Sequence, residues 1–134
     1  MTPTEIEPTA TGPTEKDLKK SEPTEYRPWG SFTVIGDYPD CKTKRLDVLP
    51  GKRLSLQSHR FRTEYWVVVC GTAKVTLNHK TLTLNPGQTL TIPVGARHRI
   101  ENPGTTMLSI IEVQLGSYFG EDDITRYHDD FDRI

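Results

Sequence analysis

Short alternating runs of apolar and polar residues extend from about Tyr26 to Gly116. The runs are rich in Val, Ile, Thr, Leu and aromatic residues, and Gly, Pro, Asn or Asp interrupts them about every eight to twelve residues. No segment between residues 26 and 115 has the spacing of an amphipathic helix. The pattern therefore predicts an all-β sandwich or barrel with strands at residues 30–36, 42–50, 53–59, 63–70, 72–78, 80–85, 88–93, 98–103 and 106–115.

The two ends of the chain differ from this pattern. Residues 1–25 repeat Pro, Thr and Glu with few large apolar side chains, so they cannot bury enough surface to offset the entropy of ordering. We expect a disordered arm there, followed by a single domain over residues 26–134. Beyond Gly116 the chain is polar and acidic, and we expect a short C-terminal helix or tail that packs on the outside through Tyr118, Phe119 and Tyr127.

Composition and the distribution of charge exclude several classes of binding partner. The 134 residues include 17 Lys and Arg and 18 Asp and Glu, and these charges are scattered, which argues against a nucleic acid or an anionic membrane as partner. No apolar stretch approaches the roughly 18 residues of a membrane span, and the N-terminus does not resemble a signal peptide, so we expect a cytoplasmic protein. Cys41 and Cys70 lack metal-site spacing and are expected to be free thiols.

The assembly is expected to be a homodimer. β-barrels of the predicted class often pair through their edge strands.

Polar and ionisable residues interrupt the strand pattern in the segment LSLQSHRFRTEYW, residues 54–66. Residues two apart in a strand share a face, so Gln57 and His59 lie together, and Glu64 follows on the next strand. His98 begins another predicted strand. If these side chains face one cavity, their nitrogen and oxygen atoms suit a divalent ion such as Zn²⁺, Mn²⁺, Fe²⁺, Co²⁺ or Ni²⁺. The alternative is that each histidine is a hydrogen-bonded core or rim residue, and alternation alone does not decide between the two.

Two longer spacings resemble the motifs of the cupin superfamily. The first is H-x₄-E-x₆-G, through His59, Glu64 and Gly71. The second is G-x₅-P-x-G-x₂-H-x₃-N, through Gly87, Pro93, Gly95, His98 and Asn102. The resemblance implies a double-stranded β-helix, or jelly-roll, barrel with a metal in its centre.

A longer resemblance covers about residues 26–133, through RPWGSF, KTKRLDVLPGKRLSLQSH, RTEYWVVVCGTAKVTL, TIPVGARHRIENPG and IIEVQLGSYFGEDDITRY. These segments are similar to the C-terminal cupin of type II mannose-6-phosphate isomerases. Such domains often follow a mannose-1-phosphate guanylyltransferase domain, in enzymes of GDP-mannose and polysaccharide biosynthesis. The implied activity is interconversion of mannose 6-phosphate and fructose 6-phosphate through an enediol, with a small sugar phosphate as partner. This chain shows no nucleotidyltransferase portion, so guanylyltransferase activity is not expected.

The resemblance also implies roles for individual residues. Phe61 stands where the usual first motif has its second histidine, and Gln57 is the substitute ligand, as in the Q-x-H pair of phosphomannose isomerases. The implied metal ligands are Gln57, His59, Glu64 and His98, and Zn²⁺ is the first choice of ion, ahead of Co²⁺, Mn²⁺, Ni²⁺ and Fe²⁺.

Two cations are the candidate catalytic residues, and only the first is implied by the resemblance. Arg62 matches an arginine of the family motif and is expected either to bind phosphate or to stabilise the enediolate. Lys44 shares a predicted strand face with Leu46 and Val48, which points it inward, although a lysine that extends from the barrel mouth into solvent is an equal alternative.

Other functions stay open at this point. Family members commonly have a histidine where this chain has Tyr65, and this departure, together with Phe61, favours a non-catalytic sugar- or sugar-phosphate-binding cupin. Another cupin enzyme, such as a dioxygenase or a nucleotide-sugar epimerase, is a third possibility, against which Phe61 counts. Trp29 and Trp66 are expected to be packing residues.

Overall fold

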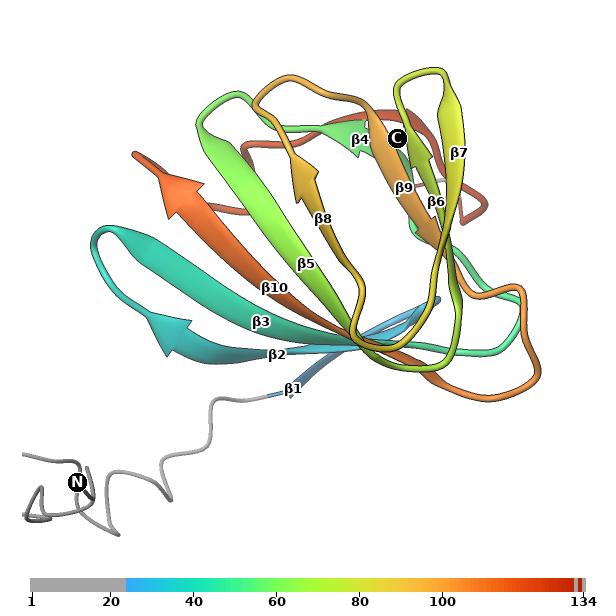
Figure 1. Cartoon of the computed structure of the whole chain (residues 1–134). Helices are drawn as coiled ribbons and strands as arrows, with labels where there is room; N and C mark the ends of the chain where they lie inside the picture. The colour runs from blue at the N-terminus through green and yellow to red at the C-terminus, as the bar shows by residue number, and fades with distance from the viewer. Residues whose placement is uncertain (1–23, 132, 134) are drawn as a thin grey trace, which may run out of the picture.

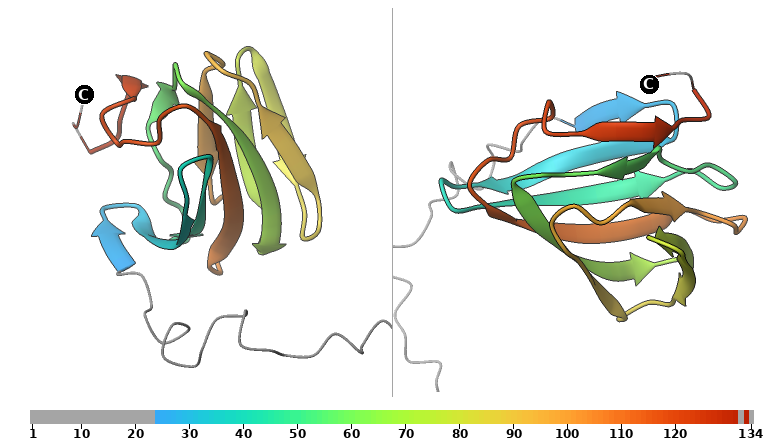
Figure 2. Two further views of the ribbon diagram at one scale, coloured as in Figure 1. Left: turned by 90° about the vertical axis from the view of Figure 1, so that its left-hand side faces the viewer. Right: turned by 90° about the horizontal axis from the view of Figure 1, so that it is seen from above.

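Two antiparallel β-sheets face one another in the computed structural model, which describes residues 24–131 and 133 (Figures 1 and 2). The six-stranded sheet has the order β1-β2-β3-β10-β5-β8, and the five-stranded sheet has the order β11-β4-β9-β6-β7. The strands are β1 (Thr24–Arg27), β2 (Gly30–Asp37), β3 (Cys41–Val48), β4 (Leu56–Ser58), β5 (Arg62–Cys70), β6 (Ala73–Leu77), β7 (Lys80–Leu84), β8 (Thr89–Ile92), β9 (His98–Glu101), β10 (Leu108–Gly116) and β11 (Thr125–His128). The predicted all-β jelly-roll class is confirmed.

The long strands bury one face, and the chemistry of that face changes along their length. In β5 the inward positions are Arg62, Glu64, Trp66 and Val68. In β10 the inward face likewise runs from Leu108 and Ile110 to Glu112 and Gln114, and β10 is antiparallel to β5. One end of the space between the sheets is therefore an apolar core, and the other end is lined by buried polar groups.

The C-terminal segment differs from the expected helix or externally packed tail. Residues 125–128 form strand β11, which pairs with the edge of β4 and places Arg126 opposite Gln57 (Figure 2). A free edge of β4 offers unpaired backbone groups, and pairing with β11 satisfies them. Tyr118 and Tyr127, which were expected to pack the tail onto the outside, are exposed, and Ile124 and Arg126 line the space between the sheets.

The N-terminal boundary also shifts, because β1 begins at Thr24 and so takes the last two residues of the predicted arm. The rest of that arm lies outside the described residues. Cys41 and Cys70 are free thiols. The described part of the chain contains no helix with the length and apolarity needed to cross a membrane. The expected homodimer stays a prediction.

Gly71, the glycine of the first motif, lies in the turn after β5 with φ +82°, and a Cβ added there meets the Met107 carbonyl oxygen at 2.8 Å. Gly51 has a similar φ of +74° with nothing within 4 Å. We expect Gly71→Ala to lower the free energy of unfolding by about 2 kcal/mol or more, because it adds a clash to left-handed backbone strain. Gly51→Ala, the matched control, is expected to cost about 1 kcal/mol. Urea unfolding measures both, and equal losses would contradict this account of the turn.

Candidate metal centre

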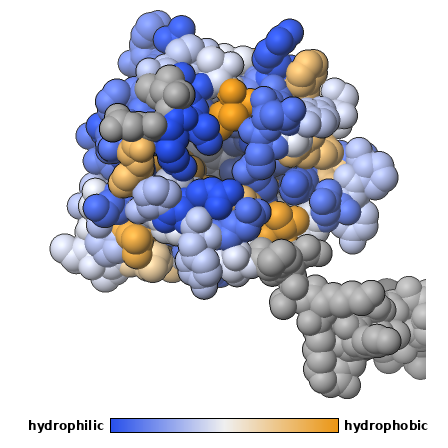
Figure 3. Space-filling model, turned by 180° about the vertical axis from the view of Figure 1, so that it is seen from behind, coloured by the Kyte–Doolittle hydropathy of each residue, from blue (hydrophilic) through white to orange (hydrophobic). Residues whose placement is uncertain are grey.

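The polar ends of the strands enclose a cavity between the two sheets. Its lining comes from β1, β2, β3, β5 and β10 of the larger sheet, from β4, β9 and β11 of the smaller one, and from segments outside the strands, including the one between β10 and β11. From behind, the molecule is hollowed near its centre, and the rim of the hollow is mostly hydrophilic (Figure 3). A cavity in this place lets a polar solute reach groups that are otherwise shielded from water.

Three of the sequence-predicted ligands meet in one cluster. His59 follows β4, Glu64 lies on β5 of the opposite sheet, and His98 begins β9. One potential ligand atom from each residue lies within 4.8 Å of the others. Their exposed fractions are 4%, 2% and 1%, so the cluster is shielded from bulk water.

Backbone carbonyls fix the orientation of both imidazoles. His59 Nδ1 donates to the Asp123 carbonyl at 2.7 Å, and His98 Nδ1 donates to the Ala96 carbonyl at 3.0 Å. Since a carbonyl only accepts, each Nδ1 carries the proton and each Nε2 presents a lone pair. These Nε2 atoms face Glu64 oxygens at 3.2 Å for His59 and 3.7 Å for His98.

The donor set fits a divalent cation. His98 Nε2 is buried without a hydrogen-bond partner among the described residues. A buried lone pair beside a carboxylate is costly unless a positive group lies between them. Two imidazole nitrogens and a carboxylate oxygen are ligands used for Zn²⁺ and related ions. The cluster is therefore compatible with metal binding.

The protonation states agree with this chemistry. Burial lowers the pKa of both histidines, to about 4 for His59. Burial raises the pKa of Glu64, but the neighbouring His98, His59 and Arg62 outweigh it and hold that pKa below its usual value. With neutral imidazoles, Arg62 is the permanent cation that keeps the carboxylate ionised. Neutral imidazoles and an ionised carboxylate are the forms that bind metals.

Gln57 lines the same cavity. It lies on β4 opposite His98, and its side-chain oxygen accepts a hydrogen bond from Ser55 at 3.3 Å. Phe61, by contrast, is 45% exposed and packs edge-on against Tyr118 at 6.3 Å between ring centroids. Strand β4 ends at Ser58, so Phe61 is not on the strand that carries Gln57. The position assigned to a second histidine therefore lies outside the cavity.

Both predicted catalytic cations are buried, at 5% exposure each, but they lie at different places in the cavity. Arg62 donates through Nε to Glu64 at 2.9 Å and through Nη2 to His59 at 3.2 Å, while its Nη1 has no partner among the described residues. Lys44 points inward, as predicted, with its Nζ over the Phe32 ring and donating to Glu121 at 3.0 Å. Arg62 belongs to the cluster, and Lys44 does not.

Sequence reasoning missed two residues that hold the cluster in place. The Asp123 carboxylate accepts the backbone N–H groups of Arg60 and Phe61, each at 3.0 Å, while its carbonyl holds His59. Trp66 is buried, as expected of a packing residue, but its indole N–H also donates to Glu64 at 3.1 Å. Asp123 lies in a segment without periodicity, so nothing in the spacing indicated it.

Glu112 is a further cavity carboxylate that the spacing did not single out. It lies on β10 between Lys44 of β3 and Trp66 of β5, and it accepts a hydrogen bond from the Gln114 side chain. Neither Arg62 nor Lys44 donates to it among the described residues. Burial raises the pKa of Glu112 to about 7, and the Glu64 carboxylate adds to the shift.

Solved structures that superpose on this chain identify its fold. CapF, a capsular polysaccharide assembling protein from Staphylococcus aureus, superposes with a TM-score of 0.74 at 22% identity, over 84% of this chain and 34% of that one. Oxalate decarboxylase from Bacillus subtilis gives 0.72 at 15% identity, over 81% and 30%. A cupin domain from Schizosaccharomyces pombe Cnp3 gives 0.62 at 15% identity, over 64% of each chain. The fold is that of a cupin.

The family described as Mannose-6-phosphate isomerase C-terminal matches residues 14–129, so this chain belongs to that family, and the predicted resemblance is confirmed. Alginate biosynthesis protein AlgA of Pseudomonas aeruginosa is 50% identical over 108 residues, covering 81% of this chain and 22% of AlgA. Xanthan biosynthesis protein XanB of Xanthomonas campestris is 49% identical over 108 residues, covering 81% and 23%. A mannose-1-phosphate guanylyltransferase of Escherichia coli is 43% identical over 123 residues, covering 87% and 26%. The chain thus spans about a quarter of the length of these relatives.

The contacts of Asp123 lead to a prediction about metal affinity. Asp123→Ala removes the carboxylate that holds two backbone amides beside His59, so the Asp123 carbonyl that orients the imidazole is less firmly positioned. We expect metal affinity to fall about tenfold or more, measured by competition with a coloured chelator. Asp122→Ala, an exposed neighbour, is the matched control and is expected to change affinity by less than about threefold. Equal affinities for the two variants, with both folded by circular dichroism, would contradict the role of Asp123.

Proposed function

We propose that this chain is a metal-dependent isomerase that interconverts mannose 6-phosphate and fructose 6-phosphate through an enediol. The observation that carries the proposal is the buried cluster of two oriented imidazoles and one carboxylate beside Arg62, at the end of an open cavity. Membership of the family supports the choice of substrate. In this proposal Gln57, His59, Glu64 and His98 hold the metal, with Zn²⁺ as the first choice.

The reaction moves a proton between C1 and C2 of the sugar. A bound divalent ion supplies Lewis-acid stabilisation of the negative charge that develops on the oxygens of these carbons. The protein's own part is to hold the sugar with C1 and C2 facing the cluster and to keep water from competing there.

Arg62 is proposed to stabilise the enediolate directly. Its Nη1 is a buried donor without a partner among the described residues, while its other nitrogens are fixed by Glu64 and His59. A donor held in this way needs no rearrangement when charge develops on a sugar oxygen. A guanidinium with a pKa above about 12 is a poor base, so proton transfer belongs to another group.

Glu112 is the proposed proton carrier. It lines the cavity, it makes no ion pair with Arg62 or Lys44 among the described residues, and its pKa of about 7 suits a group that both takes and returns a proton. Lys44 on the neighbouring strand is proposed to bind a sugar oxygen once the substrate displaces Glu121.

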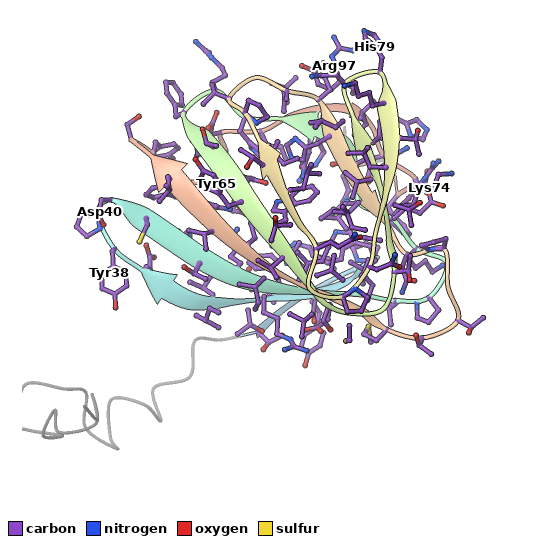
Figure 4. The ribbon with its side chains drawn as sticks, viewed as in Figure 1. Tyr38, Asp40, Tyr65, Lys74, His79 and Arg97 are labelled. Carbon is purple, nitrogen blue, oxygen red and sulfur yellow. The ribbon has the colours of Figure 1, made fainter. Side chains whose placement is uncertain are left out.

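The departures that favoured a non-catalytic cupin do not affect the cavity. Phe61 is 45% exposed, and Tyr65, labelled on β5 in Figure 4, is 42% exposed on the outer face of the sheet. Neither residue lines the cavity. No specific observation therefore favours the non-catalytic alternative.

The direct test is a coupled assay of fructose 6-phosphate formation from mannose 6-phosphate, with the chain loaded with Zn²⁺ or Co²⁺. The proposal predicts turnover that disappears on chelation and returns when the metal is added back. Absence of turnover above the chelated control for each ion would overturn the proposed function.

Two substitutions separate the roles of the cluster and of Arg62. His98→Ala is expected to lose bound metal, because it removes a ligand. Arg62→Ala is expected to keep its metal and to lower kcat by about a hundredfold or more, because it removes a donor to the developing charge. Metal content by elemental analysis and kcat are measured on the same samples. Full metal in His98→Ala, or wild-type kcat in Arg62→Ala, would contradict this assignment.

A further inference from the structure

The proposed substrate has two ends with different requirements. The reacting carbons C1 and C2 belong beside Arg62 and the cluster, whereas the phosphate is on C6, at the other end of the sugar. The phosphate must then lie toward the mouth of the cavity, away from Arg62. A phosphate there needs a cation with free donors, preferably a guanidinium.

Five Lys and Arg side chains line the cavity, against three Glu: Arg27, Lys44, Arg62, Arg126 and Arg133 against Glu64, Glu112 and Glu121. Most of these cations have carboxylate partners. Arg62 is bonded to Glu64, Lys44 to Glu121, and Arg27 to Glu25. Arg133 donates through two nitrogens to Asp129, each at 2.8 Å.

Arg126 is the exception. It lies on β11, the edge strand of the smaller sheet, and its side chain lines the cavity. Its one hydrogen bond among the described residues is a long one, 3.4 Å from Nη1 to the Arg133 carbonyl. Its Nε is buried without a partner among the same residues. A partly buried guanidinium in this state is stabilised by an anion.

The neighbouring residues hold Arg126 ready for such an anion. Asp129 accepts the backbone N–H and the side chain of Arg133, so the carbonyl that touches Arg126 is fixed. The pairing of β11 with β4 fixes the backbone of Arg126 itself. This arrangement preorganises one guanidinium, and most of its donors have no partner among the residues that the structure describes.

We propose that Arg126 is the anion anchor of the cavity and binds the phosphate group of a phosphorylated sugar. The assignment rests on the proposed function for the identity of the substrate. The proposed function itself does not require that Arg126 be the residue that binds the phosphate. Sequence reasoning missed it, because the segment was expected to be a helix or an external tail and not a strand beside Gln57.

The test compares wild type, Arg126→Gln and Arg97→Gln, each as the full chain loaded with Zn²⁺. Arg97, labelled in Figure 4, is exposed, does not line the cavity and is the matched control. Calorimetry measures affinities for mannose 6-phosphate and mannose. We expect Arg126→Gln to weaken binding of mannose 6-phosphate roughly ten- to one-hundredfold, with metal content and the affinity for mannose unchanged. Arg97→Gln is expected to behave as wild type.

A second measurement does not depend on the variants. Inorganic phosphate added to isotope-labelled wild type is expected to shift the nuclear magnetic resonance signal of the Arg126 Nε–H group. Wild-type affinity of Arg126→Gln for mannose 6-phosphate, or an unshifted Arg126 signal, would overturn the assignment. Turnover of mannose 6-phosphate is recorded separately. If the wild type turns over and Arg126→Gln binds and turns over the substrate equally well, this inference alone is wrong. If phosphate binds through Arg126 but the wild type shows no turnover, the proposed function alone is wrong.

Discussion

Burial of the Glu64 carboxylate between two sheets is the constraint on which the rest of the site depends. A charge in that position is tolerated only when positive groups or hydrogen-bond donors surround it. Arg62 and Trp66 supply donors, yet both histidines still direct lone pairs toward the carboxylate. The cluster is therefore compatible with a divalent ion, which would supply further positive charge.

The fold satisfies this constraint by dividing the space between the sheets. One end holds apolar side chains such as Val68, Leu108 and Ile110, whose burial stabilises the sandwich. The other end concentrates polar groups, which strands from both sheets and the C-terminal segment position together. The C-terminal segment contacts this end directly, because the Asp123 carbonyl accepts a hydrogen bond from His59 and β11 pairs with β4.

Much of this arrangement could be predicted from the sequence. Alternation in residues 63–70 correctly placed Glu64 and Trp66 on an inward face, and spacing brought His59 and His98 into one hypothesis. Alternation does not extend beyond Ser58, where β4 ends, and Phe61, which the motif comparison set against a second histidine, has an exposed side chain. Asp123 and Arg126 act through tertiary pairing that no local pattern encodes, because their partners are more than sixty residues away in the chain.

The central claim is that two imidazoles and a carboxylate bind one cation in this cavity. X-ray absorption spectroscopy of the chain loaded with one equivalent of Zn²⁺ tests it most directly, because imidazole rings scatter in a characteristic way. The account predicts a first shell of nitrogen and oxygen with the outer scattering of two imidazoles. A shell containing sulfur, or one without imidazole scattering, would contradict it.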